Sequence, residues 1–367
     1  IHLQFGKQII LKITLMKVYI DPRTEYRYTS FYRLGLYKLF GKNNIIYSVK
    51  PFEDLKITNA NQYGCGMEVV FDNEYGKITK VYFDIKDVAE IEKDKYDWCD
   101  IYSKVNIKFG DLEKYDKLFV PGPNFAIRNR SLIGLLTFGL KNFLRGKSSS
   151  FQSLKGFMRD YFYIYERRRS MEFYERYVEV KPNYIFHAST LWYNQFAKEC
   201  TNLYRGEFLK SCQRAGIDIE GGLYYLRNNP AVLSEMPDYP EYENVYKDFI
   251  YDKRLSMDDY ITKTKESILV FNTPSVCGCH GWKLGEYLCM GKAIISSPLL
   301  REMPGEGLIH GKDIHIVNSP EEIYDAVVKI NSDAQYRKRL EDGARRYYEK
   351  WVAPEIVIQR LLEKVGE

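Results

Sequence analysis

Residues 267–298 read SILVFNTPSVCGCHGWKLGEYLCMGKAIISSP and contain the pattern that decides the fold. An apolar run at 267–271 gives way to a loop rich in proline, glycine and cysteine, and a short amphipathic helix at 281–290 follows. Gly291 then stands where a helix C-cap needs a residue in the left-handed conformation, and a second apolar run occupies 293–295. The stretch therefore predicts a strand–loop–helix–strand unit of an α/β domain.

The loop at 272–280 and the start of the following helix form the expected ligand site. In open α/β sheets, ligands bind beyond the carboxyl ends of the strands. A helix N-terminus offers unpaired N–H groups and a partial positive charge, which suit a phosphate. Lys283 adds a cation in the first turn, and Glu286 lies three residues further on. A ligand that carries both phosphate and hydroxyl groups would use all of these features.

The residues 281–296, GWKLGEYLCMGKAIIS, resemble the donor-binding signature of group 1 glycosyltransferases with the GT-B architecture. The resemblance implies a nucleotide-sugar transferase whose C-terminal domain holds the nucleotide diphosphate. It also implies that Glu286 binds the ribose hydroxyls and that Lys283, with the helix N-terminus, binds the diphosphate. The family usually has a second glutamate eight positions before the one that matches Glu286, and this chain has Gly278 there. This departure leaves open whether the configuration at the sugar is retained or inverted.

Further ligand contacts are expected beside the signature. Asn272 and Thr273 follow the first strand directly, so they are placed for contacts with the nucleotide or the sugar. Gly281 opens the helix, and His280 before it is a candidate for contacting the sugar or a phosphate. The alternative for His280 is a histidine packed inside the loop.

An earlier strand at 184–189 and a helix at 194–214 resemble the opening of a GT-B C-terminal domain. Such domains commonly place a basic residue here against the donor diphosphate, and Arg205 is the candidate. Thr190 and Asn202 are its weaker neighbours as donor contacts. The alternative for Arg205 is a cation on the helix surface.

The length of 367 residues favours two domains, and a hydrophobic content of 45% is typical of a globular protein. The expected fold class is α/β of GT-B type: two Rossmann-like domains facing across a cleft, with C-terminal helices crossing back. We expect an N-terminal acceptor-side domain at 1–175, a donor domain at 176–350, and a C-terminal helix at 351–367 packing toward the N-terminal domain. Residues 1–15 are expected to be an extension upstream of Met16, which leads directly into a first strand.

In the N-terminal domain we expect a strand at 17–20 and a helix at 29–40 that is capped by Thr29 or Ser30. Asp21, directly after the strand, is a candidate base for deprotonating an acceptor hydroxyl. An aspartate that caps its own turn is the alternative. The other expected strands are 44–49, the hairpin 67–71 and 78–85, 97–105 and 117–121.

Residues 123–170 combine positive charge with apolar sequence. They contain ten Lys and Arg residues and two acidic residues, so ten minus two gives +8, more than the +5 of the whole chain. The apolar stretch 132–144 lies among these cations, which is the profile of a helix lying on an anionic membrane. Residues 128–169 therefore predict contact with an anionic membrane surface. A buried interdomain helix with a solvated basic rim is the alternative; no nucleic-acid motif accompanies the charge, so nucleic acid is not an expected partner.

Other features narrow the class of protein. No uncharged apolar run reaches about 18 residues, so no transmembrane helix is expected, and the first residues make a poor signal peptide. Seven cysteines do not suggest a disulfide framework. We therefore expect a cytoplasmic protein, positioned at the inner face of the plasma membrane. Cys277, Cys279 and His280 have no second Cys/His pair nearby in the sequence, so neither a metal nor a cofactor is expected.

Together these features predict an enzyme, a glycosyltransferase that moves a sugar from a nucleotide-diphosphate donor to a glycan or lipid-linked acceptor. Biosynthesis of a surface polysaccharide of the capsule or lipopolysaccharide type is the expected pathway, by analogy. Two alternatives stay open. One is a nucleotide-sugar epimerase of the same fold, and the other is a non-catalytic nucleotide-sugar-binding subunit, which the residue Gly278 favours.

Overall fold

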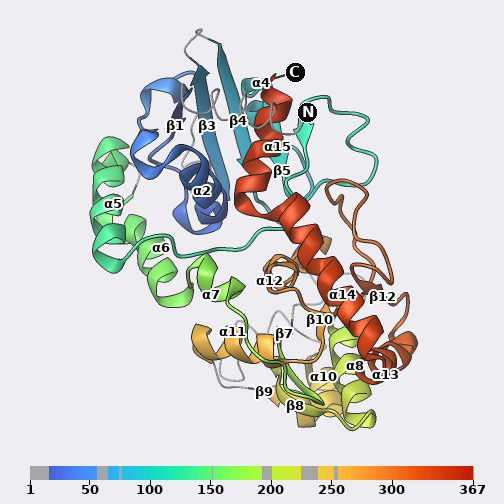
Figure 1. Ribbon diagram of the computed structural model, residues 1–367. Coiled ribbons are helices and arrows are strands. Elements are labelled where there is room, and N and C mark those ends of the chain that lie inside the picture. Colours follow the sequence, from blue (N-terminus) through green and yellow to red (C-terminus); the bar gives the residue numbers. More distant parts are fainter. Residues whose placement is uncertain are drawn as a thin grey trace. The chain divides into compact units, whose positions relative to one another are not determined.

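The computed structural model describes residues 16–55, 65–73, 77–150, 152–191, 201–224, 239–251 and 255–366. The chain divides into two compact units (Figure 1). The N-terminal unit comprises Ile1–Met171 together with Trp351–Glu367, and the C-terminal unit comprises Glu172–Lys350. The end of the chain is thus part of the N-terminal unit.

The N-terminal unit is built on a six-stranded mixed sheet in the order β2-β1-β3-β4-β5-β6. β3 runs antiparallel to β1 and to β4, and the other neighbouring pairs are parallel. The expected hairpin is confirmed, because β3 and β4 pair with Val69 opposite Val81. The strands are β1 (Met16–Ile20), β2 (Ile45–Tyr47), β3 (Gly66–Asn73), β4 (Ile78–Asp84), β5 (Ile101–Lys104) and β6 (Leu118–Phe119).

The last helix of the chain packs on the first helix of this unit. Gly35 makes the close approach possible, because a Cβ at this position would lie 2.2 Å from the carbonyl oxygen of Pro354. Lys38 and Glu355 form an ion pair across the same contact at 2.9 Å. The helices of the unit are α2 (Tyr26–Phe40), α4 (Lys93–Trp98), α5 (Leu132–Arg145), α6 (Leu154–Arg167) and α15 (Pro354–Gly366), with α7 (Met171–Glu175) at the boundary.

Two expected boundaries in the N-terminal unit were wrong. α2 begins at Tyr26 instead of 29, because the Glu25 carboxylate accepts hydrogen bonds from the N–H groups of Arg27 at 2.8 Å and Tyr28 at 2.6 Å. The sequence favoured a serine or threonine cap, since glutamate is not among the preferred N-cap residues. The strand expected at 97–105 is shorter, because its first two residues close α4.

The strands of the C-terminal unit run parallel in two groups, β9-β8-β7 and β10-β11-β12. The two groups lie side by side, because β7 is hydrogen-bonded to the residues that immediately precede β10. There the Ile268 N–H donates to the Tyr184 carbonyl at 2.8 Å, and the Phe186 N–H donates to the Ser267 Oγ at 2.7 Å. The strands are β7 (Tyr184–Thr190), β8 (Asp218–Tyr224), β9 (Ile250–Tyr251), β10 (Val270–Asn272), β11 (Ile294–Ser296) and β12 (His315–Ile316).

This arrangement puts the six strands in the order β9-β8-β7-β10-β11-β12. When the strands are numbered by their order along the chain within this unit, they lie side by side as 3-2-1-4-5-6. This is the strand order of the doubly wound nucleotide-binding fold. The order reverses between β7 and β10. In such sheets the crevice at the reversal point is where ligands bind.

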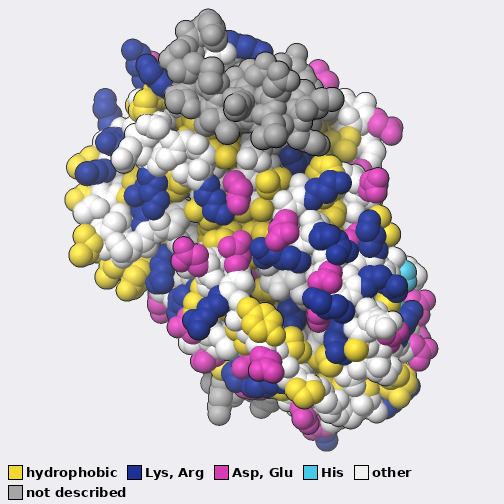
Figure 2. All heavy atoms as spheres, in the orientation of Figure 1, with side chains coloured by type: hydrophobic (Ala, Val, Ile, Leu, Met, Phe, Trp, Pro, Cys, Tyr) yellow, Lys and Arg dark blue, Asp and Glu magenta, His cyan; other side chains and the backbone are white. Residues whose placement is uncertain are grey.

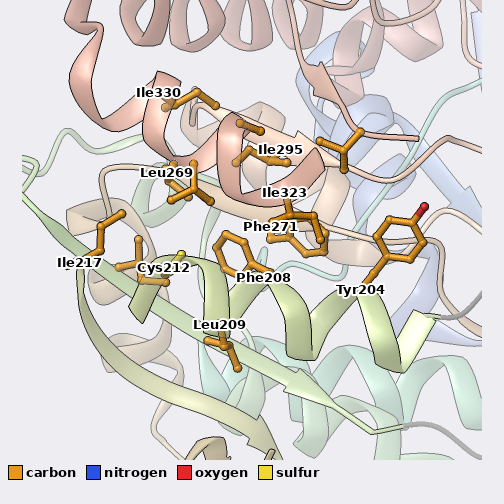
Figure 3. Close-up of a cluster of buried hydrophobic side chains, with 14 of the residues drawn as sticks. Tyr204, Phe208, Leu209, Cys212, Ile217, Leu269, Phe271, Ile295, Ile323 and Ile330 are labelled. Carbon is orange, nitrogen blue, oxygen red and sulfur yellow. The ribbon is translucent and has the colours of Figure 1, made fainter. Parts of the chain in front are cut away.

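Helices on the sheet bury an apolar core (Figure 3). Phe208 of α8 stacks on Phe271 of β10, with ring centroids 4.6 Å apart and an interplanar angle of 11°. Full burial of one such side chain stabilises a fold by about 1.5–3 kcal/mol. The helices are α8 (Thr201–Arg214), α10 (Tyr239–Tyr246), α11 (Met257–Glu266), α12 (Trp282–Met290), α13 (Ile323–Ser332) and α14 (Ala334–Tyr347).

The strand–loop–helix–strand unit that the sequence predicted is confirmed as β10, α12 and β11. Gly291 ends α12 with φ of 63° and ψ of 49°, and its N–H donates to the Leu288 carbonyl at 3.1 Å. An L-residue is disfavoured in this left-handed conformation, which explains the glycine. For the helix expected at 194–214, the structure gives α8 from Thr201, and 194–200 lie outside the described residues.

Candidate nucleotide-binding site

The carboxyl ends of β7 and β10 lie beside one another at the point where the strand order reverses. β7 ends at Thr190, and β10 ends at Asn272. The loop after β10 leads into α12, and its glycine N-cap, Gly281, has no side chain with which to satisfy the first N–H groups of the helix. The positive end of a helix dipole is thereby presented at the expected ligand position.

Lys283, in the first turn of α12, reaches back to the end of β7. Its ammonium group donates to the Ser189 Oγ at 2.8 Å and to the carbonyl of Ala188. Burial and the positive charge of Arg205 lower the pKa of Lys283 to about 7, and Glu286 acts in the opposite direction. A nearby anion would therefore favour the protonated form.

Arg205 comes from α8 and joins the two strand ends. Its Nε donates to the Thr273 Oγ1 at 3.0 Å, and another guanidinium nitrogen donates to the Thr190 carbonyl at 2.5 Å. Burial lowers the pKa of Arg205 to about 10. In the described part of the chain no carboxylate forms an ion pair with Arg205 or Lys283, which we call the cation pair.

Glu286 lies one turn beyond Lys283 and is buried. The Tyr260 hydroxyl, from α11, donates to one of its carboxylate oxygens at 2.9 Å. Burial and the negative charge of Glu286 raise the pKa of Tyr260 well above its ordinary value, so the phenol stays a donor. This contact fixes the orientation of the carboxylate.

The loop between β10 and α12 is closely packed, and it encloses no space for a water molecule. Asn272, Thr273, His280 and Gly281 belong to this packed loop. The Asn272 side chain donates to the Ser296 Oγ at 2.9 Å, and the His280 Nε2 donates to the Glu302 carbonyl at 3.1 Å. Burial lowers the pKa of His280 to about 4, so the ring is neutral at physiological pH.

The structure brings most of the predicted donor residues together. Thr190, Arg205 and Thr273 are joined by hydrogen bonds, and Lys283 bonds to the same end of β7. Asn202 lies in the first turn of α8 and is buried. The roles of these residues in donor binding stay predictions.

Gly278 occupies the place where the resembled family usually has a glutamate. Its φ is 72°, and a Cβ there would lie 3.1 Å from a methyl group of Leu300 and 3.5 Å from the guanidinium of Arg301. Arg301 donates to the carbonyl of the adjacent Cys277 at 2.5 Å. This chain therefore has a cation near the position where the family has a carboxylate.

Sequence reasoning missed His187, in the middle of β7. It is buried, and its Nε2 has no hydrogen-bond partner in the described structure. Burial and the positive charges of Lys283 and Arg205 hold the pKa of His187 well below its usual value, so the ring stays neutral. The available signal was a histidine within the otherwise apolar run Ile185–Ala188.

In the N-terminal unit, Asp21 follows β1 and is buried. It forms a bidentate ion pair with Arg23, at 2.9 Å from Nε and 2.6 Å from a terminal nitrogen, and it accepts the Arg23 N–H at 2.8 Å. The last contact is that of an Asx turn. Both carboxylate oxygens of Asp21 are therefore engaged.

A pocket of about 110 Å³ lies close to Asp21, between the start of α2 and α6. Its lining includes Glu25, Arg27, Arg159 and Asp160. Burial and the nearby Asp160 raise the pKa of Glu25 to about 8, against the lowering effect of the helix N–H donors and Arg27. Sequence reasoning missed Glu25 because its burial arises only in the fold.

Comparison with known proteins gives weak likenesses. No family model matches the chain, and no curated protein matches it. A glycosyltransferase from Rickettsia africae is 12% identical, with a TM-score of 0.42, over 77% of this chain and 69% of that one. TarM from S. aureus, solved with UDP and α-GlcNAc-glycerol, is 8% identical, with a TM-score of 0.44, over 77% and 50%. Anabaena HepE, solved with UDP-glucose, is 9% identical, with a TM-score of 0.38, over 78% and 99%.

Proposed function

We propose that this protein is a nucleotide-sugar glycosyltransferase of GT-B type whose donor site lies in the C-terminal unit. The observation that carries the proposal is the cation pair. Lys283 and Arg205 converge on the strand ends at the reversal point of a 3-2-1-4-5-6 sheet, beside the N-terminus of α12. Among the described residues neither cation has an ion-pair partner, and a diphosphate would supply one.

In the proposed reaction an acceptor hydroxyl oxygen forms a bond to the anomeric carbon of the sugar. The bond from that carbon to the diphosphate oxygen breaks, and the nucleoside diphosphate leaves with the bonding electron pair. Lys283, Arg205 and the N–H groups of α12 would stabilise the charge that develops on the leaving group. These groups can act without a resident metal or cofactor, and we propose that none is required.

We propose that Glu286 binds the ribose hydroxyls of the donor. Its second carboxylate oxygen accepts from Tyr260, which orients the group for hydroxyl donors. Asn202, Asn272, Thr273 and His280 are proposed as further donor contacts. His280 is neutral, so its ring is proposed to contact the sugar or a phosphate of the donor through hydrogen bonds.

We propose that the acceptor binds to the N-terminal unit. Asp21 remains a candidate base, but its pairing with Arg23 leaves it poorly suited to take a proton. Glu25 is a second candidate, because it lines the adjacent pocket and burial raises its pKa to about 8, although its two oxygens also accept the N–H groups that cap α2. In an inverting reaction this base would take the proton of the acceptor hydroxyl, and in a retaining reaction the leaving diphosphate oxygen would take it.

A glycan or lipid-linked acceptor in the biosynthesis of a surface polysaccharide remains our proposal. Such an acceptor would place the protein at the inner face of the plasma membrane. No helix within the described ranges is long and apolar enough to cross a membrane.

A thermal-shift screen tests the donor site. Wild type, Lys283→Ala and Glu286→Ala would be melted with UDP-, GDP-, TDP- and CMP-sugars. A ligand at 100 times its Kd adds about 2.7 kcal/mol of stability. One nucleotide class should stabilise wild type, and both variants should melt normally without responding to it. If no nucleotide sugar raises the melting temperature of wild type, the proposed function is wrong.

Product analysis separates the proposed activity from its alternatives. Transfer to an added glycan acceptor, or slow hydrolysis of the donor, would support the transferase. Interconversion of free nucleotide sugars would identify an epimerase instead. Binding without either reaction would identify a non-catalytic subunit.

A further inference from the structure

α5 of the N-terminal unit is apolar on two opposite faces. Its inner face carries Leu135, Phe138 and Phe143, which are buried. Phe138 packs edge-on against Tyr161 of α6, with ring centroids 6.2 Å apart. This inner face accounts for the packing of the helix in the fold.

The outer face of α5 carries a second apolar stripe. Ile133 is 74% exposed, Leu140 is 45% exposed and Leu144 is 66% exposed. The three follow one another at spacings of seven and four residues, which brings them onto one side of an α-helix. On α6, Phe162 is also 51% exposed. A helix that packs through one face normally presents polar side chains on the opposite face, so the apolar outer face lacks its expected cover.

Cations flank the stripe. Lys141 and Arg145 lie on the exposed side of α5, and Lys147, Lys155 and Arg159 are exposed beyond its end and on α6. In Figure 2 the edge of the molecule at α5 shows hydrophobic and Lys/Arg side chains and no acidic ones. The segment 123–170 has a net charge of +8, from ten basic and two acidic residues.

We propose that the outer face of α5 binds the surface of an anionic membrane. Ile133, Leu140 and Leu144 would enter the boundary between headgroups and acyl chains, with the helix lying in the membrane plane. Lys141 and Arg145 would contact the phosphate groups of anionic lipids. Their long aliphatic stems can lie along the apolar stripe while their charges stay at the headgroups.

The charge favours a membrane over other occupants. A second copy of the chain would bring a segment of charge +8 against one of the same charge. A nucleic acid would use the cations but would leave Ile133 and Leu144 exposed to water. An anionic lipid surface complements both features. The proposal depends on neither the donor nor the acceptor chemistry of the site above.

Vesicle co-sedimentation tests the proposal. Wild type should bind vesicles of equal parts phosphatidylcholine and phosphatidylglycerol, and should bind pure phosphatidylcholine vesicles at least tenfold more weakly. The double variants Ile133→Ser/Leu144→Ser and Lys141→Glu/Arg145→Glu should each lose at least tenfold in affinity for the anionic vesicles. Failure of wild type to bind them, or unchanged binding by both variants, would overturn the proposal.

Matched controls use exposed residues of the same unit away from this face. Phe109→Ser removes a side chain that is 60% exposed, and Lys93→Glu reverses one exposed charge. Both variants should bind like wild type, and all variants should keep the wild-type melting temperature. Equal loss in Phe109→Ser would contradict a specific contact of α5. A concentration-dependent dimer that Ile133→Ser/Leu144→Ser abolishes would assign the face to a second copy and overturn the proposal.

Failure here can be told apart from failure of the proposed function. The nucleotide-dependent rise in melting temperature reports on the C-terminal unit and should be unchanged in the variants of α5. A protein that binds anionic vesicles but no nucleotide would keep this inference and lose the proposed function. A protein that binds nucleotide but no vesicles would keep the proposed function and lose this inference.

Discussion

In the N-terminal unit the buried lysines Lys95 and Lys104 face the buried carboxylates Glu68 and Asp84, at 3.3 Å and 2.7 Å. In the C-terminal unit the cation pair, Arg205 and Lys283, bonds to carbonyl and hydroxyl oxygens instead. Burying an unpaired charge is costly, so such charges persist in proteins mainly where they have a function or a geometric role. This difference is consistent with the proposal that the ligand site lies in the C-terminal unit.

Two other lysines of the C-terminal unit show that an unpaired cation need not bind a ligand. Lys292 donates to the carbonyls of Lys265 and Ser267, and Lys265 donates to those of Phe173 and Arg176. Each therefore ties separate segments of backbone together. The cation pair differs from these two because it lies at the strand ends, beside a helix N-terminus.

The largest expected effect comes from breaking a pair in the N-terminal unit. Asp84→Asn would leave Lys104 charged and buried without its carboxylate, and would weaken the contact with the Tyr102 hydroxyl at 2.6 Å. We expect the free energy of unfolding to fall by about 3–5 kcal/mol, as measured by denaturant titration. Lys108→Ala, which removes an exposed pair with Glu90, should change it by less than about 1 kcal/mol. If Asp84→Asn and Lys108→Ala lowered the free energy of unfolding by similar amounts, the buried pair would not be more stabilising than the exposed one, and the comparison would be contradicted.

Lys283→Met should differ from Asp84→Asn, because it should weaken ligand binding without lowering stability. The variant removes a buried cation, so the melting temperature should stay the same or rise. The Kd for the nucleoside diphosphate should increase about 10- to 100-fold, because a charge-assisted hydrogen bond contributes roughly 1.5–3 kcal/mol. Calorimetric titration measures the change. Lys292→Met is the matched control, since it removes another buried cation that bonds to carbonyl oxygens, and it should leave the Kd unchanged.

The lowered pKa of Lys283 predicts that both the free energy of unfolding and the Kd for the nucleotide depend on pH. Its pKa is about 7 in the folded protein against an ordinary value of 10.5, so the unfolded chain binds the proton more tightly between these values. Its contribution to stability is therefore complete above about pH 10.5 and is lost as the pH falls through 7. A bound diphosphate would raise the pKa of Lys283, so nucleotide binding would take up a proton.

The Kd for the nucleoside diphosphate should accordingly rise by up to about tenfold per pH unit above pH 7. Titrations in buffers of different ionisation enthalpy would count the protons taken up. In Lys283→Met the slope should be absent. A slope that persists in this variant would assign the linkage to another group.

Glu286→Gln should have a smaller effect, confined to ligands that contain ribose. An amide keeps one acceptor oxygen where the carboxylate has two, so we expect about a tenfold rise in Kd for the nucleotide. Binding of inorganic pyrophosphate should be unchanged. Tyr260→Phe, which removes only the orienting hydrogen bond of 2.9 Å, should weaken nucleotide binding by less. Equal losses for pyrophosphate and nucleotide would contradict a ribose contact.

The smallest effect should come from Gly291→Ala at the far end of α12. Its φ of 63° is disfavoured for alanine, and we expect a loss of about 1 kcal/mol in the free energy of unfolding. Nucleotide affinity should not change, because the substitution leaves the N-terminus of the helix intact. A change in affinity would show that the helix shifts as a whole.

Much of the C-terminal unit could be predicted from sequence because its signals are local. The apolar runs, the loop of small residues and Gly291 predicted β10, α12 and β11 close to their observed bounds. Lys283 and Glu286 could be selected because positions along one helix follow from its periodicity. His187 was missed because a lone histidine in a strand carries no local sign of the two cations that face it in the fold.

The N-terminal unit was harder to predict around the end of β1 and the start of α2. Asp21 was selected for its place after the first strand, and the structure pairs it with Arg23. Glu25 became a candidate only because α6 packs over the start of α2 and removes water from the carboxylate. Burial of this kind depends on contacts between residues more than a hundred positions apart, which no local pattern reports.

By itself the sequence determined the α/β class, the order of elements around 267–298 and the basic, apolar character of 123–170. These follow from periodicity, from the conformational freedom of glycine and from charge, all of which act over a few neighbouring residues. Only the tertiary structure decided that β7 lies beside β10, that Arg205 meets Thr273, and that one face of α5 stays exposed. Those outcomes depend on which distant surfaces bury one another.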